Sequence, residues 1–108
     1  MRAIATLAAC ACLAGCATQL NTFHANADDM LPHCDFLSIN APMTPATRKW
    51  VNAERIGKLP KGAIVVNTAR GGVVDDDALI AALKSGRLAA AGLDVFDGEP
   101  RIHQGYYD

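Results

Sequence analysis

Residues 62–83 read GAIVVNTARGGVVDDDALIAAL, and they carry the clearest pattern of secondary structure in the chain. The apolar, β-branched run at 63–66 lacks alternation, which predicts a buried parallel strand covered on both faces. Gly71 and Gly72 predict a tight reversal through backbone conformations closed to residues with a Cβ. Asp75–Asp77 supply an N-cap and first-turn acids for a helix with apolar residues at helical spacing. The sequence therefore predicts half of a βαβ unit and an α/β fold.

Arg70 lies between the predicted strand and the glycine pair. In open α/β sheets, ligands bind just beyond the carboxyl ends of parallel strands, so this cation is placed to bind an anionic substrate or a cofactor phosphate. A solvated loop arginine is the alternative interpretation, because loop arginines are common. The residues alone leave both interpretations open.

The composition is that of one ordinary globular domain. The chain has 108 residues, of which 51% are hydrophobic and 19% charged, and its formal net charge is -1. The charges form small mixed groups without a basic patch, which argues against nucleic-acid binding. We assign no metal, because the four cysteines lack the spacing of a zinc site or a disulfide framework. They are Cys10, Cys12, Cys16 and Cys34.

Residues 1–20 differ in character from the rest of the chain. Arg2 precedes an alanine-rich apolar run, and Cys16 directly follows Leu-Ala-Gly. The pattern is similar to a bacterial lipoprotein signal, whose apolar part is too short to span a bilayer; an accidental apolar start is the alternative. We therefore leave residues 1–20 outside the predicted fold and assign residues 21–108 to the domain. Membrane attachment is expected only if the segment is a true lipoprotein signal.

Two further strands are predicted beside the first. Residues 35–39 form a second apolar run, which a proline-containing loop must end. Residues 89–95 form a third, although its alanines make it ambiguous with a helix. Helices are predicted near 52–58 and near 75–84. The expected architecture is a short parallel sheet of three strands with helices between them.

Polar residues follow each predicted strand. The loop NAPMTPAT at 40–47 combines hydroxyl groups with stiffening prolines, which suits the binding of polar ligand groups, although plain turn chemistry explains it as well. Asp94 lies near the end of the third strand. Glu99 follows in a turn, where it either orients a general-base histidine or is simply solvated. His103 lies in a tail, and a lone histidine is weak evidence of catalysis.

Three segments together resemble the D-isomer-specific 2-hydroxyacid dehydrogenases, particularly the glyoxylate and hydroxypyruvate reductase branch. They are DFLSINAPMTPATRKWVNAERI, GAIVVNTARGGVVDDDALIAALKSGRLAAAGLDVFDGEP and RIHQGYYD. The resemblance runs from about residue 29 to the end and rests on three strand-end motifs in order. It implies a partial Rossmann fold, the nicotinamide-side half of a doubly wound parallel sheet. The implied activity is hydride transfer between NAD or NADP and a small 2-keto or 2-hydroxy acid.

The resemblance also implies roles for individual residues. The arginine of the NTARGG motif binds the substrate carboxylate and keto oxygen, which places Arg70 in that role. The glutamate of the DVFxxEP motif pairs with the catalytic histidine, which places Glu99. The residues implied to line the nicotinamide and its ribose are Ala41, Pro42, Thr47, Thr68, Ala69, Arg70 and Asp94. Full-length members are expected to be cytoplasmic homodimers.

Two features of the family are not found in this sequence. It contains no GxGxxG motif, and His103 is out of register with the family's catalytic histidine, so that role is not transferred. We therefore expect a fragment of an oxidoreductase that is inactive alone. The alternative hypothesis is a non-catalytic, possibly lipid-anchored module with a remnant dinucleotide-binding surface.

Overall fold

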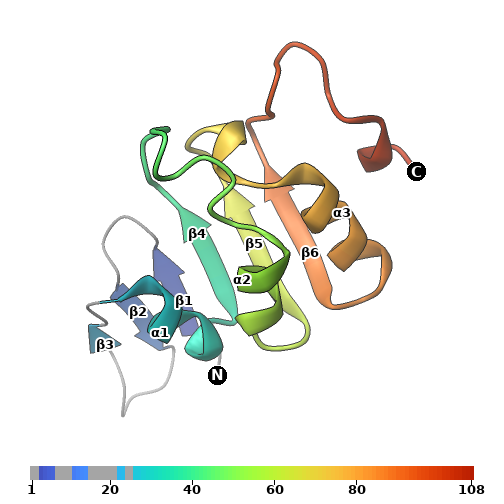
Figure 1. The fold of residues 1–108 in the computed structure, drawn as a ribbon. Helices are drawn as coiled ribbons and strands as arrows, with labels where there is room; N and C mark the ends of the chain where they lie inside the picture. Colours follow the sequence, from blue (N-terminus) through green and yellow to red (C-terminus); the bar gives the residue numbers. More distant parts are fainter. Residues whose placement is uncertain (1–2, 7–10, 15–21, 24–25) are drawn as a thin grey trace.

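The computed structural model describes residues 3–6, 11–14, 22–23 and 26–108. Figure 1 shows strands lying side by side in one sheet, with helices packed beside it. In chain order the elements are β1 (Ala3–Thr6), β2 (Ala11–Ala14), β3 (Thr22–Phe23), α1 (Ala27–Met30), the 3-10 turn η1 (Leu31–His33), β4 (Phe36–Ile39), α2 (Ala53–Lys58), β5 (Ala63–Asn67), η2 (Gly71–Val73), α3 (Asp76–Lys84), β6 (Leu88–Leu93) and η3 (Gln104–Tyr106).

The sheet has the strand order β3-β2-β1-β4-β5-β6. Strands β4, β5 and β6 are parallel neighbours, with Leu37 opposite Val65 and Val65 opposite Ala91. Helix α2 connects β4 to β5 and α3 connects β5 to β6, as parallel pairing requires. The predicted α/β fold with three parallel strands and two intervening helices is confirmed.

The sheet also extends into the segment that the sequence analysis leaves outside the fold. Strand β1 pairs in parallel with β4, and β2 and β3 follow it in antiparallel pairs. Excluding residues 1–20 is therefore wrong for residues 3–6 and 11–14. The physical reason is that β4 would otherwise keep an unpaired edge, whose backbone groups an apolar extended run can satisfy. Cys16, on which the lipoprotein pattern rests, lies outside the described residues, so the signal itself stays a prediction.

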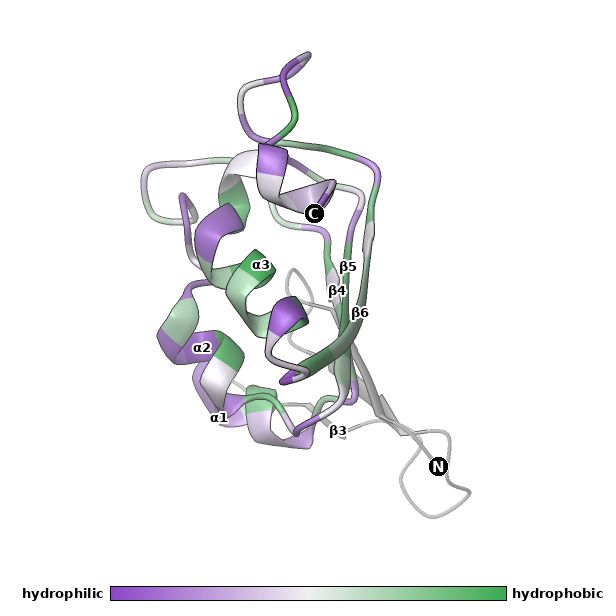
Figure 2. Cartoon of the chain, turned by 90° about the vertical axis from the view of Figure 1, so that its right-hand side faces the viewer, coloured by the Kyte–Doolittle hydropathy of each residue, from purple (hydrophilic) through white to green (hydrophobic). Residues whose placement is uncertain are grey.

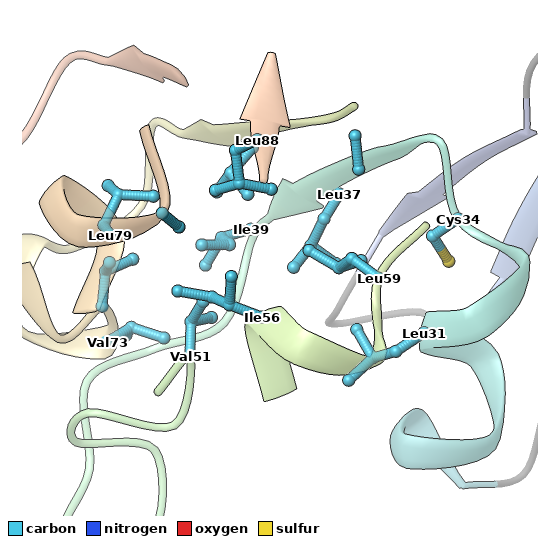
Figure 3. Close-up of a cluster of buried hydrophobic side chains, with 14 of the residues drawn as sticks. Leu31, Cys34, Leu37, Ile39, Val51, Ile56, Leu59, Val73, Leu79 and Leu88 are labelled. Carbon is cyan, nitrogen blue, oxygen red and sulfur yellow. The ribbon is translucent and has the colours of Figure 1, made fainter. Parts of the chain in front are cut away.

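The hydrophobic core lies between the sheet and the helices. Leu37 from β4, Ile56 from α2 and Leu79 from α3 are all buried in it, and Figure 3 shows their side chains meeting in the same cluster. Leu31, in η1, and Leu59, directly after α2, extend the same cluster. The apolar residues at helical spacing in α3 thus form one buried face of the helix, which packs against the strands.

Helices α2 and α3 cover one face of the parallel strands (Figure 2). Strand β5 accordingly alternates between buried residues and the half-buried Ile64 and Val66. The expectation that β5 is covered on both faces is wrong for the part of the chain that the structure describes. A continuous apolar run misled the prediction, because β-branched residues also favour the half-buried face of a strand.

Both ends of α2 are capped by side chains. Asn52 is the N-cap of α2, and its Oδ1 accepts a hydrogen bond of 3.0 Å from the Arg55 backbone N–H. At the other end, Arg87 Nη2 donates to the carbonyl oxygens of Gly57 and Leu59 at 2.7 and 2.6 Å. These carbonyl groups would otherwise lack a partner within the helix.

A charged network joins α1 to α2. Arg55 Nε and Lys58 Nζ lie 3.0 and 3.1 Å from Asp28 Oδ1, and the Arg55 guanidinium lies 4.1 Å from the centroid of the Trp50 ring. The hydrogen bond from Arg55, followed by that from Lys58, holds the pKa of Asp28 below its ordinary value.

Within the described ranges, no helix has the length and apolar character needed to cross a bilayer.

The C-terminal tail packs on the first turn of α3. Tyr106 Oη donates to Asp76 Oδ1 at 2.6 Å, and His103 Nε2 lies 2.9 Å from Asp77 Oδ1. Burial, followed by the hydrogen bond to Asp76, raises the pKa of Tyr106. Asp75 occupies the predicted N-cap position, but its side chain makes no capping hydrogen bond. Asp76 and Asp77, in the first turn of α3, therefore bind the C-terminal tail through Tyr106 and His103.

Candidate functional site

The loops that follow β4, β5 and β6 lie together at the carboxyl ends of these parallel strands, the carboxyl edge of the sheet (Figure 1). The backbone N–H of Asp94 donates to the Asn67 carbonyl oxygen at 3.1 Å, so the ends of β5 and β6 remain paired. This edge is where open α/β sheets bind ligands. The three predicted strand-end motifs are thus brought to one side of the molecule.

Asn67 organises the loop that carries Arg70. Its side chain is almost completely buried; Oδ1 accepts from the Ala69 N–H and Nδ2 donates to the Arg70 carbonyl oxygen, each at 3.0 Å. Such a side-chain turn fixes the backbone on both sides of the bonded groups. No functional role was predicted for Asn67 from the sequence. The sequence feature that could have indicated this role is an asparagine directly before a turn, where asparagine side chains commonly bond the backbone.

Arg70 is exposed and lines two adjoining pockets. The first, of about 510 Å³, is lined by Asn40, Ala41, Pro42, Met43, Ala69 and Arg70. The second, of about 340 Å³, is lined by Met43, Arg70, Gly71, Gly72, Val95, Phe96, Asp97 and Glu99. Arg70 Nη1 donates to the Ala69 carbonyl oxygen at 2.7 Å. A guanidinium carries five N–H donors, so further donors remain for an anionic ligand.

Glu99 reaches the second pocket from the loop after β6. Its Oε1 accepts a hydrogen bond of 2.6 Å from the Phe96 backbone N–H, which closes the turn between these residues. The structure thus brings the two predicted catalytic residues, Arg70 and Glu99, to the lining of one pocket. Their roles stay predictions.

The residues predicted to bind the cofactor divide into two groups. Ala41, Pro42 and Ala69 line the first pocket with Arg70. Thr68 and Asp94 are exposed and line neither of the two pockets.

Thr47 is half-buried and also lines neither of these two pockets. Its Oγ1 donates to the Pro42 carbonyl oxygen at 2.7 Å and accepts from the Thr44 N–H at 2.8 Å. Thr47 therefore shapes the loop that presents Pro42 to the pocket.

The glycine pair after Arg70 is needed for close packing. A Cβ on Gly71 would lie 2.0 Å from the Phe96 carbonyl carbon, and one on Gly72 would lie 3.1 Å from Met43 Sδ. The expectation of backbone conformations closed to other residues is wrong here, because the left-handed glycines among the described residues are Gly62, Gly86 and Gly98. The pair instead lets two loops lie directly against the turn.

His103 lies apart from the pocket that holds Arg70 and Glu99. Its Nε2 faces Asp77, and its Nδ1 accepts from the Gly105 N–H at 3.0 Å. It lines a different pocket at the start of α3. In the part of the chain that the structure describes, no group of three or more His, Cys, Asp or Glu residues is arranged to hold a metal ion.

The sequence matches the family model of the NAD binding domain of D-isomer specific 2-hydroxyacid dehydrogenases over residues 14–106. The chain belongs to this family. The match begins inside the segment that resembles a signal, so the comparison gives that interpretation no support. The nicotinamide dinucleotides, NAD or NADP, are the cofactors of the family.

Relatives of the chain carry names from the predicted branch. Over 87 residues it is 58% identical to a glycerate dehydrogenase of Hyphomicrobium methylovorum, covering 81% of this chain and 27% of the relative. It is 45% identical over 83 residues to a hydroxypyruvate reductase of Thermotoga maritima, covering 77% of this chain and 27% of the relative. The chain thus spans about a quarter of the length of these curated relatives.

A solved structure shares the fold. The D-isomer specific 2-hydroxyacid dehydrogenase of Xanthobacter autotrophicus Py2, solved in complex with NADPH and MES, superposes with a TM-score of 0.68 at 48% identity. The match covers 71% of this chain and 32% of that one.

The described residues fit the nicotinamide end of such a cofactor. The first pocket is open, lies at the carboxyl edge of the sheet, and combines the apolar Ala41 and Pro42 with the polar Asn40. This mixture suits a flat ring that carries an amide. The sequence contains no GxGxxG motif to hold the pyrophosphate, so the fit concerns the nicotinamide side alone.

Proposed function

We propose that the carboxyl-edge site is the nicotinamide and substrate side of an oxidoreductase that interconverts small 2-keto and 2-hydroxy acids of the glyoxylate and hydroxypyruvate type. The observation that carries this proposal is the shared pocket of Arg70 and Glu99, next to the pocket formed by residues 40–43. Membership of the dehydrogenase family supports this hypothesis over a non-catalytic module.

Arg70 is proposed to hold the substrate by its carboxylate. A guanidinium forms two parallel hydrogen bonds with a carboxylate, and its charge also polarises a neighbouring keto oxygen. Stabilising the charge that develops on this oxygen lowers the barrier to reduction. Asn67 fixes the Arg70 backbone, so the cation is presented from a defined turn.

Glu99 is proposed to orient the proton donor. A carboxylate that accepts an imidazole N–H stabilises the imidazolium, which then protonates the keto oxygen. The Phe96 N–H holds one oxygen of Glu99, which limits the positions that the carboxylate can take. His103 is bound to Asp77, so we do not assign it as the donor.

The cofactor is proposed to lie against the first pocket. Ala41, Pro42 and Ala69 would contact the nicotinamide ring, which supplies the hydride when the cofactor is bound. Thr47, Thr68 and Asp94 are proposed to contact the ribose and the carboxamide. A cytoplasmic location and a homodimeric assembly of the whole enzyme are proposals of the same kind.

Binding measurements on this chain test the proposal. Oxalate, a dicarboxylate mimic of the substrate, should shift the amide resonances of residues 69–72 in NMR titrations. Reduced nicotinamide mononucleotide should shift the amide resonances of Asn40, Ala41 and Met43. Arg70→Ala should abolish the oxalate response, and Arg70→Lys should retain little of it, because an ammonium lacks the planar pair of donors. Arg101→Gln removes an exposed arginine outside both pockets and should leave the response unchanged. An oxalate response that survives Arg70→Ala would refute the assigned role.

A further inference from the structure

Two loops pack against the glycine pair that follows Arg70. The backbone of Phe96 and Asp97 lies where a Cβ of Gly71 would be, at 2.0 and 2.2 Å from that position. On Gly72, a Cβ would lie 3.1 Å from Met43 Sδ and 3.3 Å from Arg48 Nη1. The loops after β4 and β6 therefore meet over the turn after β5.

The loop after β4 is also held by backbone hydrogen bonds. The Lys49 N–H donates to the Gly72 carbonyl oxygen at 2.8 Å, and the Val51 N–H donates to the Val73 carbonyl oxygen at 3.0 Å. The Val51 carbonyl oxygen in turn accepts from the Asp75 N–H at 2.9 Å. Lys49 adopts a left-handed φ of 50° in this arrangement. The backbone that carries Arg48 is thus fixed beside the glycine pair.

From this position, Arg48 reaches the third loop. Its Nη2 lies 3.4 Å from Asp97 Oδ2, and the two side chains are 50% and 34% exposed. Asp97 lies inside the turn that the Phe96–Glu99 hydrogen bond closes. A contact that restrains Asp97 therefore also restrains the turn that holds the Glu99 carboxylate.

We propose that Arg48 is a positioning residue, whose ion pair with Asp97 clamps the 96–99 turn and so holds Glu99 in the pocket with Arg70. The inference rests on the proposed function for the role of Glu99, although the clamp itself is a property of the three loops. Arg48 contributes through Asp97 and does not need to contact substrate.

The clamp is tested by amide exchange at Phe96 in the full chain. Arg48→Gln and Asp97→Asn should each speed exchange of the Phe96 N–H by about 1.5- to 5-fold, the range expected for a partly exposed ion pair. The double variant should exchange no faster than either single variant, because both changes break the same contact. Exchange at Val65, in the core of β5, should stay constant and show that global stability is preserved. Lys61→Gln, a charge change at an exposed loop residue before β5, is the matched control.

Charge reversal provides the rescue. Arg48→Asp combined with Asp97→Arg should restore slow exchange at Phe96, whereas each reversed single variant should exchange faster than wild type. Unchanged exchange in Arg48→Gln, or effects of the two single variants that add, would overturn the clamp. This readout requires no ligand, so a failure of the chain to bind oxalate would count against the proposed function and leave the clamp to be decided by exchange alone.

Discussion

Asn67 Nδ2 donates a 3.0 Å hydrogen bond to the Arg70 carbonyl oxygen from a side chain that is only 1% exposed. Asn67→Ala removes this donor and also the acceptor of the Ala69 N–H. We expect the free energy of unfolding to fall by about 1–3 kcal/mol, the usual cost of leaving buried polar groups without partners. Urea denaturation followed by circular dichroism measures this change.

The neighbouring exposed residue provides the control for that experiment. Thr68→Ala should change the free energy of unfolding by less than about 0.5 kcal/mol, as for most surface substitutions. Equal losses in the two variants would show that Asn67 has no special part in the turn.

Two glycine substitutions should have effects of opposite sign. Gly71→Ala places a Cβ against the Phe96 backbone, which cannot move as a flexible side chain does, and should destabilise the chain by about 3 kcal/mol or more. Gly57→Ala adds a methyl group with no atom within 4 Å, inside α2. It should stabilise the chain by about 0.5–1 kcal/mol, the difference in helix propensity. Thermal unfolding of both variants measures these changes in stability. A Gly71→Ala variant as stable as wild type would contradict the close packing of the loop after β6 against Gly71.

The ion pairs of Asp28 predict a loss of stability in acid. A carboxyl group whose pKa is lowered by folding adds stability above its unfolded pKa and loses this contribution as the pH falls through its folded pKa. The ordinary value is 3.8, and the hydrogen bonds from Arg55 and Lys58 lower it in the fold. Between about pH 5 and pH 2, wild type should therefore lose more stability than Asp28→Asn.

Asp29→Asn is the matched control for the acid experiment, because Asp29 is the exposed neighbour in the same turn of α1. Its pH dependence should follow that of wild type. A wild-type slope in Asp28→Asn would mean that the network contributes nothing to stability.

Catalysis itself is testable in a longer relative. We expect this chain alone to show no hydroxypyruvate or glyoxylate reductase activity, because it spans 27% of the glycerate dehydrogenase relative and its sequence contains no GxGxxG motif. In that relative, replacing the arginine equivalent to Arg70 by alanine should nearly abolish kcat/KM. Replacement by lysine should rescue little of it, since a point charge does not reproduce the two-pronged contact. Near-normal efficiency of the lysine enzyme would contradict the role given to Arg70.

The parallel strands and the helices between them were predictable because each has a local signal. Short apolar runs mark β4 and β5, and Asn52 marks the start of α2. Arg70 and Glu99 were predictable as site residues only through the resemblance to the family, because a loop arginine or a turn glutamate has no distinctive local pattern.

The remaining features depend on contacts between residues far apart in the sequence, which the spacing of residue types along the chain does not reveal. The close approach of Phe96 to Gly71 joins two loops from different strands, and the Arg48–Asp97 pair joins residues 49 positions apart. The coverage of β5 on one face depends equally on where helices pack, whereas its apolar run is compatible with both arrangements. Strands in the first residues were missed because an alanine-rich apolar run also resembles a signal sequence.

The contact between Arg87 and the end of α2 bears on the order in which the chain folds during synthesis. Helix α2 has only six residues, and an isolated helix of that length does not persist in water. The guanidinium that binds its last carbonyl groups is made about thirty residues later, immediately before β6. On the ribosome, α2 therefore acquires its complete C-terminal cap only after Arg87 has emerged from the exit tunnel, so this part of the domain is completed after translation has passed α3.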